Sequence, residues 1–358
     1  MTRLVPAWRS PLGAVFLARR LDAMYSRSRR TSGIAGAATI QHVETGNLMA
    51  DHTAYFCGQW VPFSQVKVDP MDRGFLVGDA VFDVARTFKG KSFRLQEHVD
   101  RLYRSLKCVR MDPGISPDEM VTISEEVIAR NQHLRAEMGD FAIWQWVTRG
   151  RGRWAHSAGP PTVCVCVRAL GFARFAHLYT AGAHGVIVRS RSYSPDVLDP
   201  KIKNFSRMNF NMAELEVADV DKAGWPILTD SRGNVTEGPG YNVFAVTHGV
   251  IRTADDRHVL QGVSRGMVFD LAKELAIPAV EEELQPYDFY TADEVFIAST
   301  SPCVLPVTRM DWRKIGDGIP GPVVHRLLAA WSEAVGVDIV KQALEFAPKE
   351  QQESKAGS

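Results

Sequence analysis

The strongest constraint on this fold is the order of short strand-like and helix-like segments that begins after residue 50. Leu95, Val99, Leu102 and Leu106 recur at helical spacing, and Ser116 begins a typical helix start with a proline next and an acid third. The expected elements of the first half are a hairpin at 54–61, a strand at 81–88, helices at 95–108 and 116–131, and strands at 141–148 and 161–168. Together they predict one α+β unit.

A second α+β unit is predicted after a segment of weaker periodicity at 170–182. Its expected elements are a strand at 185–189, helices at 209–222, 266–275 and 322–334, several hairpins, and a strand at 294–298. We therefore predict an α+β fold with a small domain over 51–172 and a large domain over 173–345.

The two ends of the chain differ in composition from the rest. Residues 1–50 contain seven arginines, no lysine and only two acids. Such a leader is typical of an organellar transit peptide, and a poorly ordered extension ahead of Met49 is the interpretation that we favour. The polar stretch at 346–358 is expected to be a disordered tail.

Charge and cysteine content exclude several classes of protein. Lys plus Arg number 42 against 41 Asp plus Glu, which argues against a nucleic-acid binder with a strong basic field. No apolar run approaches the roughly 18 residues of a membrane span, so we expect a soluble protein. The five cysteines are scattered and form no C-x-x-C pair, which indicates neither a disulfide framework nor a metal site and favours the cytoplasm.

Two turns in the second unit could bind an anion. Gly262-Val263-Ser264-Arg265 opens the helix predicted at 266–275, where free backbone N–H groups and a serine hydroxyl would suit a phosphate. Ser299-Thr300-Ser301 follows the predicted strand at 294–298 and offers further hydroxyls. Each turn alone is a weak signal, but the two together indicate a phosphate site.

Lys203 and Glu237 supply the other groups that a pyridoxal phosphate site needs. Lys203 stands in Asp199-Pro-Lys-Ile-Lys-Asn-Phe205, and Glu237 in a glycine-containing turn that leads to Tyr241-Asn242. A phosphate cup, an amine nucleophile and a carboxylate are the three requirements of that cofactor.

At this point the chain resembles the class IV aminotransferases over nearly all of residues 51–340. Six motifs carry the resemblance, in the order of the family: Asp72-Arg-Gly-Phe-Leu-Val-Gly-Asp-Ala-Val-Phe-Asp83, Glu97-His-Val-Asp-Arg-Leu102, Lys203-Asn204, Thr236-Glu-Gly238 to Asn242-Val-Phe244, Leu260-Gln-Gly-Val-Ser-Arg265, and Asp293-Glu-Val-Phe-Ile-Ala-Ser-Thr300. The resemblance implies the two-domain D-amino acid aminotransferase-like fold, fold type IV of the pyridoxal 5′-phosphate enzymes, and a homodimer.

The resemblance also implies a role for each cofactor-binding position. Lys203 would form a Schiff base with the cofactor and then move the Cα proton, while Glu237 would keep the pyridine nitrogen protonated. Lys201 is not expected in this role, because its separation from Glu237 does not match the lysine-to-glutamate spacing of the family. The phosphate would be bound by Arg101, Val263, Ser264 and Thr300.

Substrate-binding residues are predicted in the first unit. Phe82 lies in the first motif, and Val84 and Arg86 directly follow it on the strand predicted at 81–88. A strand arginine among apolar residues usually needs an anion, either a substrate carboxylate or an internal acid. Trp144 and Trp146 alternate on one strand, so both indoles face the same side, either an apolar pocket wall or the core.

The loop residues Arg153 and His156 resemble the pair with which D-amino acid enzymes hold a carboxylate. Their spacing of three departs from the family pattern of two. The motifs around Lys203 and Glu237, in contrast, are most similar to those of the (R)-amine transaminases.

The sequence thus predicts an aminotransferase that moves an amino group from a D-amino acid or (R)-primary amine to a 2-oxo acid. Val84, where branched-chain enzymes have glycine, argues against the branched-chain L-amino acid aminotransferases, which are the runner-up. An aminodeoxychorismate lyase is the third alternative, and a non-catalytic phosphate-binding protein is the alternative from another class.

Overall fold

The computed structural model describes residues 51–356, with side chains as far as Pro348. The predicted leader at 1–50 lies outside the described residues. No helix in this described part is long and apolar enough to cross a bilayer.

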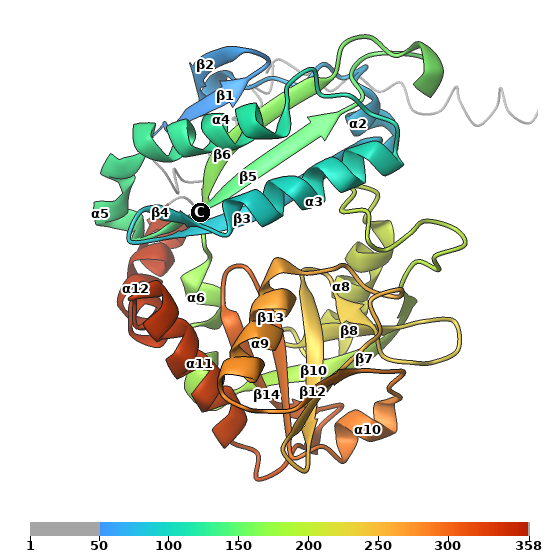
Figure 1. Ribbon diagram of the computed structural model, residues 1–358, viewed down its shortest axis with the longest axis vertical. Coiled ribbons are helices and arrows are strands. Elements are labelled where there is room, and N and C mark those ends of the chain that lie inside the picture. The colour runs from blue at the N-terminus through green and yellow to red at the C-terminus, as the bar shows by residue number, and fades with distance from the viewer. Residues whose placement is uncertain (1–50, 357–358) are drawn as a thin grey trace, which may run out of the picture. The chain divides into compact units, whose positions relative to one another are not determined.

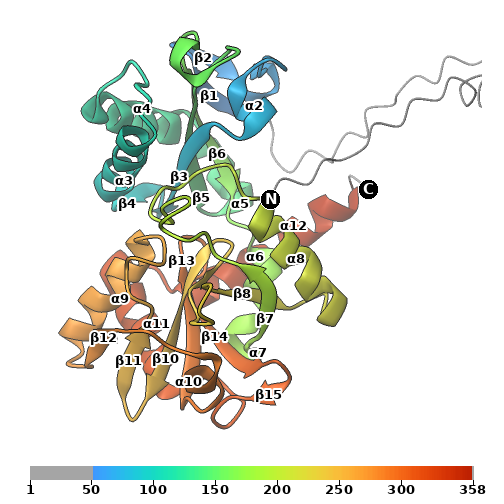
Figure 2. The ribbon, with the colours of Figure 1, turned by 90° about the vertical axis from the view of Figure 1, so that its right-hand side faces the viewer.

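The first sheet has six antiparallel strands in the order β2-β1-β6-β5-β3-β4 (Figure 1). Its strands are β1 (Thr53–Phe56), β2 (Gln59–Pro62), β3 (Ala80–Phe88), β4 (Lys91–Phe93), β5 (Phe141–Thr148) and β6 (Thr162–Ala169). The helices and turns that accompany it are η1 (Phe63–Gln65), α2 (Arg73–Val77), α3 (Leu95–Cys108), α4 (Pro117–Arg130), η2 (Gln132–Leu134), α5 (Arg135–Met138) and η3 (Ala155–Ser157). Helices α3 and α4 cover one face of the sheet (Figure 2).

Side-chain alternation explains this packing. Val163, Val165 and Val167 lie in the core with α3 and α4, while Cys164 and Cys166 lie on the opposite face of β6. The start of α4 is also confirmed, because Ser116 and Glu119 form a reciprocal capping box.

The second sheet has nine strands, with the path β12-β11-β10-β13-β14-β7-β8, while β9 pairs with β10 and β15 with β14. Its strands are β7 (Ala183–Arg191), β8 (Trp225–Thr229), β9 (Glu237–Gly238), β10 (Tyr241–Thr247), β11 (Val250–Thr253), β12 (Ala279–Glu281), β13 (Glu294–Ser299), β14 (Cys303–Met310) and β15 (Arg313–Lys314). Its helices are α6 (Phe172–Phe175), α7 (Leu178–Ala181), α8 (Met208–Val220), α9 (Val263–Glu274), α10 (Pro286–Tyr290), α11 (Pro322–Val335) and α12 (Ile339–Ala356).

The core of this second unit lies between the sheet and helices α9 and α11, and α8 packs on β7 and β8. Two expectations need correction. The weakly periodic segment at 170–182 contains the short helices α6 and α7. The stretch expected to be a disordered tail from 346 continues α12 to Ala356, and its first residues, Phe346 and Ala347, pack on the core. The division into domains at 172 and 173 stays a prediction.

The segment that carries Lys203 joins the second unit to the first sheet. Phe82 N–H donates to the Lys203 carbonyl at 3.0 Å, and Phe205 N–H donates to the Ala80 carbonyl at 3.0 Å. Lys203 therefore lies against the edge of β3, next to the residues of the first motif.

Candidate active site

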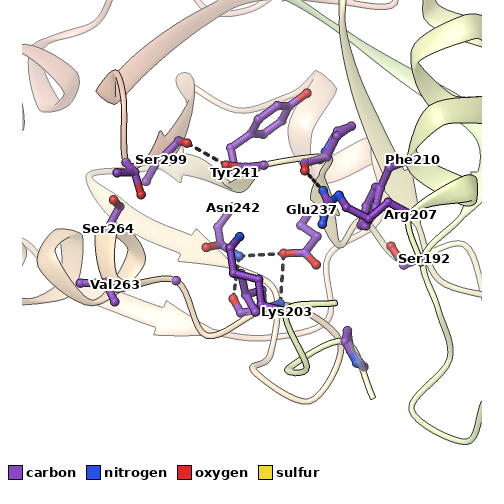
Figure 3. Close-up of a pocket in the computed structure, with 18 of the residues that line it drawn as sticks. Ser192, Lys203, Arg207, Phe210, Glu237, Tyr241, Asn242, Val263, Ser264 and Ser299 are labelled. Atoms are coloured by element: carbon purple, nitrogen blue, oxygen red, sulfur yellow. Dashed lines mark hydrogen bonds between the residues drawn. The ribbon is translucent and has the colours of Figure 1, made fainter. Parts of the chain in front are cut away.

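All six residues that the sequence predicts as cofactor-binding line one cavity (Figure 3). They come from distant parts of the chain: Arg101, Lys203, Glu237, Val263, Ser264 and Thr300. The structure therefore brings the six residues together at one cavity, and their roles as cofactor ligands stay predictions.

Lys203 is partly buried, and its backbone fixes its place beside the cavity. Its N–H donates to the Ser105 hydroxyl at 3.2 Å, and its Nζ lies 4.7 Å from the centre of the Phe82 ring. Burial, together with the charge of Arg101, lowers the pKa of the Lys203 amine to about 7. A large share of the amine is therefore neutral near neutral pH, which is the form that attacks a carbonyl.

Glu237 is a buried carboxylate, 6% exposed, at the start of the β9–β10 hairpin. Its Oε2 accepts hydrogen bonds from Leu260 N–H at 3.0 Å and from Asn242 Nδ2 at 3.2 Å. Burial nevertheless raises the pKa of Glu237 to about 7. A cation in the cavity would favour its ionised form, and a protonated pyridine nitrogen is such a cation.

Arg101 is oriented by a fully buried aspartate. Its Nε and Nη2 donate to the two oxygens of Asp83, each at 2.8 Å, and His98 Nδ1 lies 2.6 Å from Asp83 Oδ1. Burial alone would raise the pKa of Asp83, but Arg101 and His98 hold it well below its usual range. The ion pair fixes the guanidinium at the cavity, where it can meet a phosphate.

The N-terminus of α9 forms the other side of the anion site. The N-cap is Gly262, and no side chain caps the helix, so its first N–H groups remain available to an anion. A Cβ on Gly262 would come within 2.3 Å of Asn242 Oδ1, so a larger residue here would displace the Asn242 side chain that contacts Glu237. Val263 and Ser264 follow directly, and Thr300 lies on the same cavity with its hydroxyl donating to the Val84 carbonyl at 3.2 Å. These residues fit the phosphate of pyridoxal 5′-phosphate.

Replacing Arg101 should release the cofactor. We expect Arg101→Gln to raise the dissociation constant of pyridoxal phosphate by roughly ten- to a hundredfold, because a charge-assisted phosphate contact contributes on the order of 1.5–3 kcal/mol. Equilibrium dialysis with the apoprotein measures it. Arg104→Gln, at an exposed position on the same helix, is the control. Equal affinities of both variants would contradict the assignment.

Sequence reasoning missed three residues of the site. Asp83, Asn242 and Arg207 contact or line it, although Asp83 and Asn242 stand in the quoted motifs. The signal for Asp83 was a lone acid in an apolar strand, which usually needs a cation. Arg207 follows Lys203 by four residues, and nothing in the sequence shows that its side chain faces the cavity.

The predicted aromatic residues of the substrate site lie beside Lys203. The Phe82 ring is 4.6 Å from that of Phe205 and 6.4 Å from that of Trp144. Trp144 and Trp146 face the same side of β5, as predicted, and their rings are 6.4 Å apart. These aromatic residues lie next to the cavity but do not line it. The same holds for Val84, whose carbonyl accepts a hydrogen bond from the Thr300 hydroxyl.

Arg153 and His156 lie on the loop between β5 and β6, away from this cavity. The Arg153 guanidinium lies over the exposed Trp154, at 5.4 Å from the ring centre, and its carbonyl accepts from Arg73. Their predicted contact with a substrate carboxylate stays a prediction, which requires the loop to reach the site of another subunit.

Arg86 does not meet the anion that the sequence led us to expect. Its guanidinium is 2% exposed, outside the cavity, and donates to the Ser301 carbonyl at 2.6 Å and to Gln342 Oε1 at 3.0 Å. It also lies 3.9 Å from the centre of the Phe88 ring. Carbonyl oxygens and a ring face surround the guanidinium, so Arg86 joins β3 to the turn between β13 and β14 and to α12.

Arg86 should therefore affect stability and leave substrate preference unchanged. We expect Arg86→Gln to lower the free energy of unfolding by about 2–4 kcal/mol, because buried acceptors lose their donors. The ratio of kcat/KM for D-alanine and (R)-1-phenylethylamine should stay within about twofold, since both depend on the same fold. Arg86→Lys, which retains the charge, tests the need for the planar group. A tenfold change in that ratio at an unchanged melting temperature would restore the substrate role.

Comparisons with known proteins show the family of this chain. Residues 80–310 match the family model for class IV aminotransferases. A protein of Methanocaldococcus jannaschii, provisionally named a branched-chain-amino-acid aminotransferase, is 35% identical over 76% of this chain and 93% of its own length. The D-alanine aminotransferase of Staphylococcus aureus is 32% identical over 75% of this chain and 93% of its own length. A T.th. branched-chain amino acid aminotransferase, solved with pyridoxamine 5′-phosphate, superposes with a TM-score of 0.74 at 29% identity, over 80% of this chain and 95% of that one.

The fold and the cavity thus define a pyridoxal-phosphate enzyme of fold type IV. The chain belongs to the class IV aminotransferase family, and it is a pyridoxal-phosphate-dependent aminotransferase.

Proposed function

We propose that this aminotransferase takes its amino group from a D-amino acid or an (R)-primary amine and passes it to a 2-oxo acid. The observation that carries the apolar part of this proposal is the aromatic wall of Phe82, Phe205 and Trp144 beside Lys203, which suits a hydrophobic substituent. The D-configuration is supported by the similarity to a D-alanine aminotransferase.

The cofactor-site residues divide the tasks of the reaction among them in this proposal. When bound, pyridoxal phosphate withdraws electrons from the substrate Cα and carries the amino group between substrates. Lys203 binds the cofactor covalently and moves the Cα proton, and Glu237 holds the proton on the ring nitrogen. Arg101, Val263, Ser264 and Thr300 bind the phosphate and so fix the ring between the lysine and the glutamate.

Branched-chain L-amino acid transamination is the second candidate, because the Methanocaldococcus jannaschii relative is 35% identical and carries that provisional name. The aromatic wall would also suit a leucine or isoleucine side chain. The two candidates differ in the configuration of the donor and in whether a carboxylate is needed.

A donor panel separates these candidates. D-alanine, L-leucine and (R)-1-phenylethylamine are each paired with pyruvate and with 2-oxoglutarate, and product formation is followed by chiral chromatography. The proposal expects turnover of D-alanine, the amine or both, with L-leucine at least tenfold slower. Preferred turnover of L-leucine would replace it with the branched-chain assignment.

We also propose a cytoplasmic homodimer. Two helices carry large exposed apolar side chains that a subunit interface would cover, with Phe75 73% and Val77 60% exposed on α2, and Met208 69% and Leu215 62% exposed on α8. All five cysteines are free thiols, which supports a reducing compartment. Light scattering of the active enzyme tests the dimer, and an active monomer would contradict it.

A further inference from the structure

Arg207 is a cation that lines the cavity, and it is not one of the six residues assigned to the cofactor. It lies one residue before α8 and four after Lys203. Its guanidinium carbon is 4.3 Å from the centre of the Phe210 ring and 5.7 Å from that of the Phe82 ring. The side chain is thus held between two aromatic faces at the edge of the cavity.

The protein offers Arg207 little to bind. Its Nη2 donates to the Pro239 carbonyl, and among the side chains that the structure describes no carboxylate lies within 4.0 Å of the guanidinium. Burial lowers the pKa of Arg207, although Glu237 and Glu214 oppose the effect from a distance. Arg101, in contrast, has both oxygens of Asp83. A partly buried guanidinium that lines a cavity without a paired anion indicates that a ligand supplies one.

The shape of pyridoxal phosphate shows which ligand atom this is. Its ring nitrogen and its aldehyde carbon lie at opposite ends of the ring, and its phosphate arm and its ring oxygen lie on opposite edges. In the proposed function Glu237 would meet the nitrogen end and Lys203 the aldehyde end. Figure 3 shows Val263 and Ser264 on one side of these two residues and Arg207 on the other. With the phosphate arm bound on the first side, the ring oxygen would face Arg207.

We propose that Arg207 binds the 3-oxygen of pyridoxal phosphate and stabilises it in its anionic form. The inference rests on the proposed places of Lys203 and Glu237 in the same cavity. A guanidinium stays charged at all ordinary pH values, and beside a phenolic oxygen it favours the ionised form. Arg207 would then be a cofactor-binding residue that also sets the pH range in which the bound cofactor titrates.

A cofactor analogue without the oxygen tests this contact. Equilibrium dialysis gives the dissociation constants of pyridoxal 5′-phosphate and of 3-deoxypyridoxal 5′-phosphate for the native apoprotein, Arg207→Gln and Arg207→Lys. The native protein should prefer the natural cofactor at least about tenfold, and Arg207→Gln should reduce that preference to below about threefold. Arg207→Lys should keep part of it because the charge remains. Arg191→Gln, at an exposed position just beyond the cavity, should keep all of it.

The outcomes are distinct. A full preference in a folded Arg207→Gln protein, verified by its melting temperature, overturns the proposal. If the preference is kept and Arg207→Gln loses turnover of amino acids but not of neutral amines, Arg207 is assigned to the substrate carboxylate instead. If the native protein bound neither compound, the proposed function would fail together with this inference, whereas a preserved preference contradicts the Arg207 contact alone. If Arg207→Gln does not fold, the preference for the natural cofactor is measured in Arg207→Ala and Arg207→Lys. Its loss supports the Arg207 contact, and its full retention overturns it.

Discussion

Lys203→Ala is expected to lose catalysis almost completely, with kcat lower by about a thousandfold or more. The reason is that one amine both binds the cofactor covalently and moves the Cα proton, so that two steps fail together. Lys203→Arg should be equally inactive, because it keeps a cation but not a nucleophilic amine. Steady-state transamination of the best donor found in the panel measures the effect.

Lys201→Ala is the matched control. Lys201 lies two residues away, its side chain is 34% exposed, and its amine lies 3.1 Å from Asp199 Oδ1. Its removal should change kcat by less than about threefold, since an exposed ion pair contributes little. Cofactor attachment to the apoprotein adds a pH test. Because the Lys203 amine has a pKa lowered to about 7, attachment should speed up as the pH rises through 7 and then level off. A steady rise toward pH 10 would mean an ordinary lysine.

Glu237→Gln is expected to lower kcat by roughly a hundred- to a thousandfold while the cofactor stays bound. An amide cannot keep the ring nitrogen in its charged form, so the ring withdraws electrons less well in the proton-transfer step. The phosphate contacts are untouched, and the amide oxygen can still accept from Leu260 N–H as Oε2 does. The single-turnover rate of proton transfer and the cofactor dissociation constant are measured side by side.

Glu283→Gln provides the control for this substitution. Glu283 is half exposed and pairs with Arg232, outside the cavity, and its change should leave both quantities unaltered. Turnover at the native rate in Glu237→Gln would contradict the role of the carboxylate. Loss of the cofactor at an unchanged proton-transfer rate in the remaining holoenzyme would show that Glu237 holds the ring and does not activate it.

The sequence predicted the local elements of this site well because their signals are local. The spacing of Leu95, Val99, Leu102 and Leu106 predicts α3, and α3 places Arg101 toward β3. The turns at Gly262 and Thr300 stand where a helix begins and a strand ends, and backbone groups are free at both. The resemblance to the class IV aminotransferases, which these local motifs carry, then implied the six cofactor residues before any tertiary contact was known.

Long-range partners could not be predicted in the same way. Arg86 finds Ser301 and Gln342, which lie 215 and 256 residues further along the chain. Its need for a partner follows from burial, but the partner's identity depends on how β14 and α12 pack against β3. The direction of the Arg207 side chain depends likewise on Phe210 and Phe82, which only the fold brings together.

The place of covalent attachment tests the central claim most directly. Borohydride reduction of the holoenzyme fixes the cofactor on its lysine, and tryptic peptides are then mapped by mass spectrometry. Attachment at Lys203 blocks cleavage after that residue, so we predict a labelled peptide from Ile202 to Arg207. A label on a peptide that runs through Lys201 and ends at Lys203, or on any other lysine, would contradict the account.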